Sequence, residues 1–205
     1  MSEELERKYL GVHRDTLRPL LQALGATPCH GAHFEANTVY DRDGELYARL
    51  ELLRLRTREW PDHADVRLTF KRPLPDLVLA TGTAKRREET ELGLEDAQKM
   101  DLILQALGYR PVGRYEKVRE SWTLGAASID MDELPFGHFV EIEAPEADLV
   151  RVEAALHLDK CPASAKSYHV LHQEWLAGHH LPARTSFVFT DERRAELRAA
   201  LGLAR

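Results

Sequence analysis

The sequence predicts an α+β protein whose antiparallel strands close into a β-barrel. Three observations predict this fold: short segments of alternating polar and apolar residues recur, helical segments interrupt them, and the polar faces of the strands carry charges sorted by sign. The 205 residues are enough for one large domain or two small ones, and for a substantial core. The composition, 43% hydrophobic and 30% charged, is that of a globular protein rich in charge.

The expected strands alternate in polarity and are bounded by turns rich in Gly, Pro or Asp. They are expected at residues 5–11, 33–41, 48–60, 64–73, 83–92, 115–125, 126–133 and 138–145. Helices are expected at residues 15–27, 94–111, 146–158, 164–178 and 190–202. Two of these helices should stop at Gly25 and Gly108, because glycine readily adopts the left-handed conformation that ends a helix.

The domain organisation follows from a repeat and from a change of composition. The residues LQALG occur at 21–25 and again at 104–108, each time before charged strands, which suggests two similar halves. After Gly178 the chain reads as a linker followed by a short helix with Thr190 as its N-cap. We therefore expect one domain at residues 1–178 and a C-terminal extension with a short helix at 179–205.

The polar face of each predicted strand carries a row of charges. Arg54 and Arg56 share one face of a strand, and Leu53 and Leu55 share the other. The other rows are Arg67 and Lys71, Arg87 with Glu89 and Glu91, Lys117 and Arg119, Asp130 and Asp132, and Glu141 and Glu143. Each row alone is explained by a sheet with one face in solvent. Like charges two residues apart repel, however, so the rows together call for neutralising partners.

Closing the sheet into a barrel with the charged rows inside would supply those partners. Basic rows could then hold a polyanion such as a triphosphate, to which arginine offers paired hydrogen bonds. Acidic rows could hold Mg²⁺ or Mn²⁺, which bind carboxylates together with phosphate oxygens. A tunnel with both kinds of row suits metal-dependent phosphoryl transfer.

These rows resemble the sequence blocks of a known family. ELERK, at residues 4–8, resembles the ExExK signature of the CYTH domain, the domain of the triphosphate tunnel metalloenzymes. Further blocks follow in family order: NTVYD (37–41), LRLR (53–56), LTFK (68–71), the spaced Arg87, Glu89 and Glu91, KVRESW (117–122), DELPFGHFVEIE (132–143) and KSY (166–168). The resemblance covers roughly residues 3–178. It implies an eight-stranded antiparallel tunnel with helices packed outside.

The resemblance also implies a role for each charged residue. The triphosphate would be bound by Lys8, Arg54, Arg56, Lys71, Arg87, Lys117, Arg119 and Lys166. The metal ions, Mg²⁺ or Mn²⁺, would be bound by Glu4, Glu6, Glu89, Glu91, Asp130, Asp132, Glu141 and Glu143. Either Asp130 or Asp132 takes the position of the family's aspartate. Glu4, Glu6, Lys8 and Glu143 would form the catalytic centre.

Three functions are open at this stage. The family includes class IV adenylyl cyclases, thiamine triphosphatases and inorganic triphosphatases. We favour metal-dependent hydrolysis of an inorganic or organic triphosphate by water, because the sequence has no clear adenine-binding feature. The first alternative is a class IV adenylyl cyclase that converts ATP to cyclic AMP and pyrophosphate. The second is a non-catalytic module that binds polyphosphate or nucleotide, which is disfavoured because both the acidic and the basic rows are complete.

Other features of the sequence argue against several classes of protein. The net charge of −6 speaks against a nucleic-acid partner, and no apolar run approaches the roughly 20 residues that span a membrane. Two cysteines and a charged start without an apolar stretch fit a cytoplasmic protein. Cys29, His30 and His33 lack the further ligand that zinc needs. The expected partner is a small triphosphate-containing molecule, and the oligomeric state is open, a homodimer included.

Overall fold

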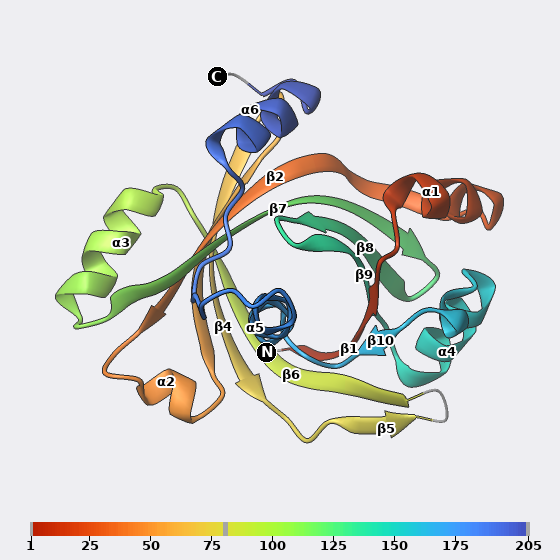
Figure 1. The fold of residues 1–205 in the computed structure, drawn as a ribbon, viewed down its shortest axis with the longest axis horizontal. Helices are drawn as coiled ribbons and strands as arrows, with labels where there is room; N and C mark the ends of the chain where they lie inside the picture. Colours follow the sequence, from red (N-terminus) through yellow and green to blue (C-terminus); the bar gives the residue numbers. More distant parts are fainter. Residues whose placement is uncertain (1, 80–81, 204–205) are drawn as a thin grey trace.

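The computed structural model describes residues 2–79 and 82–203 and contains a closed β-barrel (Figure 1). Eight strands pair in the order β1-β9-β8-β7-β2-β3-β4-β6, and β6 pairs again with β1 to close the ring. Their bounds are β1 Ser2–Leu10, β2 Thr27–Asp41, β3 Leu52–Glu59, β4 Ala64–Pro73, β6 Gly82–Leu94, β7 Arg110–Leu124, β8 Ala127–Leu134 and β9 Gly137–Glu143. All these pairings are antiparallel, which confirms the predicted fold class.

Two short strands and six α-helices complete the described structure. Strand β5 (Leu77–Leu79) pairs with β6, and β10 (Ala163–Ser164) pairs with β1. The helices are α1 Arg14–Ala23, α2 Glu45–Ala48, α3 Ala97–Ala106, α4 Glu146–Ala155, α5 Tyr168–Gly178 and α6 Asp191–Ala200, and a 3₁₀ turn lies at Leu158–Lys160. None of these helices is long and apolar enough to cross a membrane.

Two helices depart from the sequence prediction. The helix expected at 164–178 begins only at Tyr168, because Ser164 pairs with β1 and the Ser167 hydroxyl caps the helix by accepting from the Val170 N–H. The short helix α2 was not predicted. It follows the turn at Gly44, and the Asp41 carboxylate stabilises it by accepting from backbone N–H groups in its first turn.

The outward faces of the strands form the hydrophobic core, as their alternation predicts. Val140 and Ile142 are fully buried in a cluster with apolar residues of α1 and α4. Leu53 and Leu55 lie in a second cluster with Leu104 of α3. Burial of one apolar side chain of this kind contributes roughly 1.5–3 kcal/mol. The helices therefore cover the apolar outside of the barrel and leave its inner face to the charged residues.

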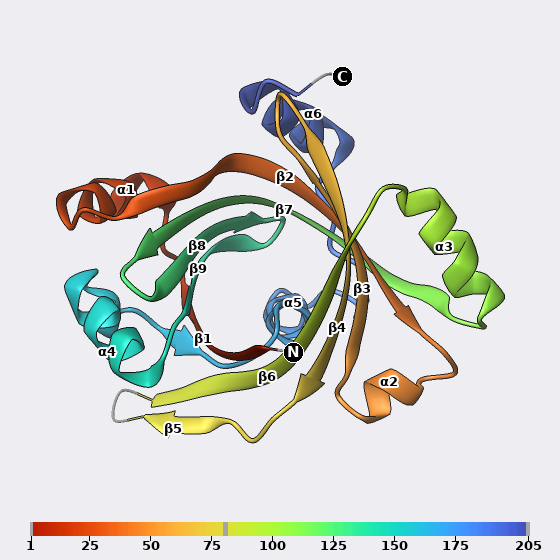
Figure 2. The same cartoon turned by 180° about the vertical axis from the view of Figure 1, so that it is seen from behind.

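Helix α5 differs from the other helices in its position relative to the barrel. In Figures 1 and 2 it lies within the outline of the ring, whereas α1, α3 and α4 lie around the ring. Ser167, Tyr168 and His169 line the central cavity, and Leu171 packs in a cluster with Tyr115 of β7. The first turn of α5 therefore forms part of the tunnel wall.

The C-terminal segment packs against the outside of the barrel. Phe189 and Leu197 are buried in a cluster with Phe34 and Val118. The chain runs so close to β7 that a Cβ on Gly113 would lie 2.9 Å from the carbonyl oxygen of Thr185. Only glycine permits this approach without a shift of backbone. The division into residues 1–178 and 179–205 stays a prediction, and the extension adds buried apolar contacts to the barrel.

Candidate functional site

The barrel encloses a cavity of about 430 Å³ lined mainly by charged side chains. Twelve of the predicted site residues line it: Glu6, Lys8, Arg54, Arg56, Lys71, Glu89, Glu91, Lys117, Arg119, Asp130, Glu141 and Glu143. They come from seven different strands of the ring and meet because alternate residues of a strand point to the same face. The alternation in the sequence therefore predicted this cavity correctly.

Three predicted residues are placed differently, and a fourth lies outside the description. Lys166 points away from the cavity and pairs with Glu174 at 2.6 Å, both side chains being about half exposed. This placement follows from the start of α5, because Lys166 precedes the first turn while the next three residues face the tunnel. Arg87 is half-buried but does not line the cavity. Asp132 lies behind the cavity wall, and the side chain of Glu4 lies outside the described part of the structure.

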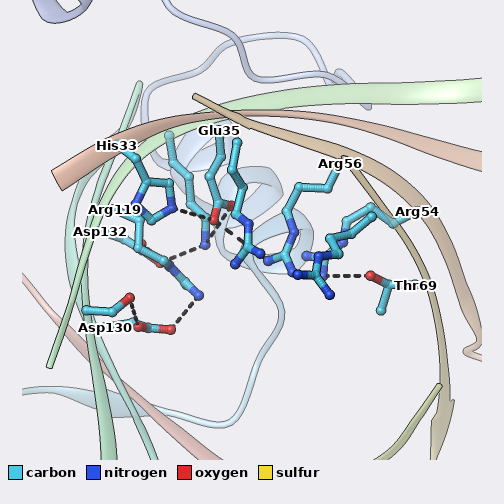
Figure 3. Close-up of polar contacts among 12 residues, drawn as sticks. His33, Glu35, Arg54, Arg56, Thr69, Arg119, Asp130 and Asp132 are labelled. Carbon is cyan, nitrogen blue, oxygen red and sulfur yellow. Dashed lines mark hydrogen bonds and ion pairs between the residues drawn. The ribbon is translucent and has the colours of Figure 1, made fainter. Parts of the chain in front are cut away.

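A network of ion pairs forms the wall around Arg119 (Figure 3). The Arg119 guanidinium donates to Asp132 at 2.6 Å and also pairs with Asp130 and Glu141. Asp132 is 3% exposed and accepts further hydrogen bonds from Lys117, at 3.2 Å, and from the Tyr168 hydroxyl, at 2.8 Å. Asp132 therefore anchors β7 and α5 to β8, whereas Asp130 is the aspartate that lines the cavity.

Glu35 and His33 of β2 also line the cavity, and the sequence analysis did not select them. Glu35 is fully buried between Arg56 and Lys117, with N–O distances of 3.7 and 3.5 Å, and contacts His33 Nε2 at 3.1 Å (Figure 3). Burial opposes its ionisation, but Lys117 and Arg56 hold the pKa of Glu35 well below its ordinary value. The alternation of β2 could have revealed Glu35, which shares a face with Asn37 of the NTVYD block.

Most cations in the cavity have a carboxylate partner. Lys8 pairs with both Glu6 and Glu141, and Lys71 pairs with Glu89. Arg56 pairs with Glu91 at 2.8 Å, and Arg58, another lining residue, pairs with Asp65. These pairs cancel much of the charge that the sequence places in the tunnel.

Two lining cations have no such partner among the described residues. Within the described part of the chain, Arg54 donates only to the neutral hydroxyl groups of Tyr115 and Thr69, and Lys85 of β6 makes no hydrogen bond or ion pair. Burial and the neighbouring Lys8 lower the pKa of Lys85 to about 8. Lys85 lies two residues before Arg87, so the alternation of this strand could have predicted it. Buried unpaired cations are costly, which marks this part of the tunnel as a site for an anion.

Glu143 is the acidic counterpart of these cations. Its side chain faces the lumen and is exposed there, and within residues 2–79 and 82–203 no hydrogen bond or ion pair engages it. Desolvation in the tunnel raises the pKa of Glu143 to about 7, with Glu6 and Asp130 adding to the rise against the pull of Lys71. Glu143 therefore faces the cavity with no ion pair to a cation among the described residues, although Lys71 lies near enough to act on it.

The carboxylates near Glu143 fit a divalent cation by their chemistry. Glu6, Glu89 and Asp130 influence the ionisation of Glu143, and all four side chains line the cavity. Hard cations such as Mg²⁺ and Mn²⁺ prefer carboxylate oxygens and need few protein ligands when phosphate oxygens complete the coordination. No three acidic, histidine or cysteine side chains in the described structure are already arranged as a metal cluster. The donor set therefore fits a cation that binds together with its substrate.

Similarity to known proteins identifies the family. The CYTH domain model matches residues 2–158, and the chain belongs to the CYTH domain family. The chain is 29% identical over 112 residues to a candidate adenylate cyclase of Methanocaldococcus jannaschii, a match that covers 49% of this chain and 61% of that protein. The chain thus spans less than two thirds of the length of this curated relative.

Solved structures share the fold. The PH1819 protein of Pyrococcus horikoshii OT3 has a TM-score of 0.67 at 23% identity, covering 83% of this chain and 98% of that one. A candidate adenylyl cyclase from Hippeastrum, described as having a dominant triphosphatase activity, has a TM-score of 0.59 at 21% identity, covering 89% and 99%. At these identities the likeness shows the fold alone.

Proposed function

We propose that the protein is a divalent-metal-dependent triphosphatase, which transfers a phosphoryl group from a triphosphate to water inside the tunnel. The observation that carries the proposal is the distribution of unpaired charge in the cavity. Among the residues that the structure describes, Arg54 and Lys85 are cations without a carboxylate partner, and Glu143 is a carboxylate without a cation partner. A ligand that brings both phosphate groups and a metal ion would neutralise both kinds of group at once.

The basic residues would bind and orient the triphosphate. Arg54 and Arg56 project from one strand, and Lys117 and Arg119 project from another, so the phosphate chain would be held between two basic rows. Lys8 and Lys71 complete this set, and Arg87 remains a candidate from the sequence. Charge shifts among the phosphate oxygens during transfer, so fixed cations would stabilise the transition state as well as the bound substrate.

The acidic residues would hold the metal ion. Glu6, Glu89, Asp130 and Glu143 supply carboxylate oxygens, and the first three of them also form ion pairs, with Lys8, Lys71 and Arg119. Glu91 and Glu141, which also line the cavity in ion pairs, and Glu4 remain candidates from the sequence. When bound, Mg²⁺ or Mn²⁺ would neutralise phosphate charge and lower the pKa of a coordinated water. Without a metal, the Glu143 pKa of about 7 also suits a carboxylate that accepts a proton from water near neutral pH.

The relatives support a triphosphate substrate and leave two reactions. The structural relative from Hippeastrum is described as having a dominant triphosphatase activity, which favours hydrolysis. The relative from Methanocaldococcus jannaschii is a candidate adenylate cyclase, which makes cyclisation of ATP the second candidate. Both reactions would use the same basic and acidic rows, so the attacking group distinguishes them.

Product analysis tests the proposal. The purified protein would be incubated with inorganic triphosphate, ATP or thiamine triphosphate, each with Mg²⁺ or Mn²⁺ and with a metal-free control. We expect metal-dependent release of orthophosphate or pyrophosphate by water. Cyclic AMP from ATP would replace the proposal with the cyclase, and tight binding without turnover would indicate a non-catalytic module.

A further inference from the structure

A buried ion pair lies on the outside of the barrel, apart from the charges that line the tunnel. Arg7 of β1 is 0% exposed and Glu153 of α4 is 2% exposed. The Nη1 atom of Arg7 donates to Glu153 Oε1 at 3.1 Å and to Oε2 at 3.0 Å. The Arg7 Nε–H donates to the carbonyl oxygen of Thr83 in β6, at 3.3 Å. The guanidinium therefore ties β1 both to α4 and to β6.

The neighbours of this pair along β1 and α4 are apolar. Tyr9, the next residue on the same face of β1, is fully buried in the hydrophobic cluster outside the barrel, as are Leu149 and Val152 of α4. Glu153 follows Leu149 by four residues, so it shares a face of the helix with a core residue. A buried ion pair adds little net stability, because the desolvation of two charges offsets their attraction. Stability alone is therefore a weak reason for a carboxylate at this position.

The sequence around Arg7 defines the register of β1 weakly. Glu6, Arg7 and Lys8 are three consecutive charges, so at least one of them faces outward in either register of the strand. A shift of one residue would move Glu6 and Lys8 out of the tunnel and Arg7 into it. In the structure, Glu6 and Lys8 line the cavity, and Glu153 holds Arg7 outside.

We propose that Glu153 is a positioning residue for the tunnel, because its ion pair with Arg7 fixes the register of β1 and so keeps Glu6 and Lys8 in the cavity. The inference rests on the proposed function in one respect, namely that these two side chains serve the metal ion and the triphosphate.

The two partners of the ion pair have unequal roles in this proposal. An arginine stays charged in any protein environment, so without Glu153 the guanidinium of Arg7 has to reach water or the carboxylates of the tunnel. Strand β1 would then shift or fray, and the lining of the tunnel would change with it. Loss of Arg7 instead leaves an apolar outward face on β1, which favours the observed register.

Matched variants separate positioning from stability. Glu153→Leu leaves Arg7 without its carboxylate, and Arg7→Leu leaves Glu153 without its cation. Leu149→Ala is the control, because it removes a fully buried side chain from the same helix and keeps the ion pair. Each single change should lower the urea midpoint, and the double variant Arg7→Leu/Glu153→Leu should recover much of the loss. Binding is measured by calorimetry with inorganic triphosphate in a chelator, and by electron paramagnetic resonance with Mn²⁺.

We expect Glu153→Leu to weaken the binding of both triphosphate and Mn²⁺ about tenfold or more, because Lys8 and Glu6 leave their places together. Leu149→Ala, Arg7→Leu and the double variant should bind both ligands like the wild type. Wild-type affinity in Glu153→Leu, with its fold intact by circular dichroism, would overturn the positioning role, and so would equal losses in all the single variants. If Glu153→Leu does not fold, Glu153→Gln, which keeps the shape and removes the charge, replaces it under the same criteria.

Hydrogen exchange separates this inference from the proposed function. If the wild type binds neither triphosphate nor Mn²⁺, the proposed function fails, and amide exchange of residues 2–10 still tests the register of β1. Faster exchange of this segment in Glu153→Leu than in Leu149→Ala and Arg7→Leu would support the role of Glu153. Equal exchange in the three variants would overturn it.

Discussion

Two groups of charges in the same tunnel differ in whether they form ion pairs. Around Arg119, each charge has partners: Asp130, Asp132 and Glu141 surround the guanidinium, and Asp132 also holds Lys117. Glu143 and Lys85, by contrast, line the cavity with no ion pair among the described residues. The comparison suggests that the paired charges hold the wall together and that the unpaired charges serve ligands.

The difference has an energetic basis. Removing one partner of a buried ion pair leaves the other charge uncompensated, which costs about 3–5 kcal/mol. A buried charge that lacks a partner lowers the free energy of unfolding. Replacing it by a neutral side chain should therefore make the folded protein more stable. The two groups should therefore respond in opposite ways when a carboxylate is replaced by a neutral side chain.

The largest expected effect is on stability, from Asp132→Ala. This change removes the acceptor of Arg119, Lys117 and the Tyr168 hydroxyl at once. We expect the free energy of unfolding to fall by about 3–5 kcal/mol, measured by urea denaturation. An unchanged urea midpoint would show that the network around Arg119 does not hold the wall together.

The next effect is on activity, from Glu143→Gln, which keeps the shape of the side chain and removes its charge. As a proposed metal ligand, Glu143 should contribute at least as much as an outer-shell partner, so kcat/KM should fall about 100-fold. Steady-state rates at several Mg²⁺ concentrations measure this. If the variant keeps the activity and the metal dependence of the wild type, Glu143 is not a ligand of the metal ion.

Arg56→Ala sharpens the distinction between the acidic and basic rows. Arg56 pairs with Glu91 at 2.8 Å and lines the cavity, so its loss should weaken triphosphate binding about tenfold or more and also slow turnover. Excess Mn²⁺ should restore part of the activity of Glu143→Gln, because Mn²⁺ tolerates looser coordination than Mg²⁺. It should restore none to Arg56→Ala, and equal rescue of both variants would contradict the separate roles.

The smallest effect is on the pH dependence of metal binding. The pKa of Glu143 is raised to about 7, so below that pH a metal ion must displace a proton from this carboxylate. The apparent affinity for Mn²⁺ should therefore fall by up to about tenfold per pH unit below 7 and level off above it. Electron paramagnetic resonance can follow free Mn²⁺. In the control variant Glu143→Gln, the part of the pH dependence that comes from this carboxylate should be absent.

The sequence predicts the barrel and most of its lining because strand alternation is a local property. Alternate residues such as Arg54 and Arg56 must share a face wherever the strand lies. The same rule places Lys85 on one face with Glu89, and Glu35 on one face with Asn37, although neither Lys85 nor Glu35 belongs to a block that resembles the family. His169 and Lys166 show the limit of local patterns. Where a helix begins, and which of its residues meets the tunnel, depends on contacts with distant strands such as β1.

The sequence also does not show which charges form ion pairs with one another. Asp130 and Asp132 are equivalent by alternation, and the structure separates them because Asp132 lies behind the wall while Asp130 faces the cavity. Likewise, Glu141 and Glu143 share a face, but of these two carboxylates it is Glu141 that forms ion pairs with Lys8 and Arg119. Which charge stays unpaired depends on the reach of side chains across several strands.

The most direct test of this comparison is the stability of two matched variants at pH 8. Asp132→Asn and Glu143→Gln each replace one carboxylate of the barrel by an amide of similar shape. The raised pKa of Glu143 means that its charged form opposes folding as the pH rises through 7, so Glu143→Gln should be more stable than the wild type at pH 8. Asp132→Asn should be less stable, because Arg119 and Lys117 lose their shared carboxylate. Urea midpoints that shift in opposite directions would support the division into structural and ligand-binding charges, and a loss of stability in both variants would contradict it.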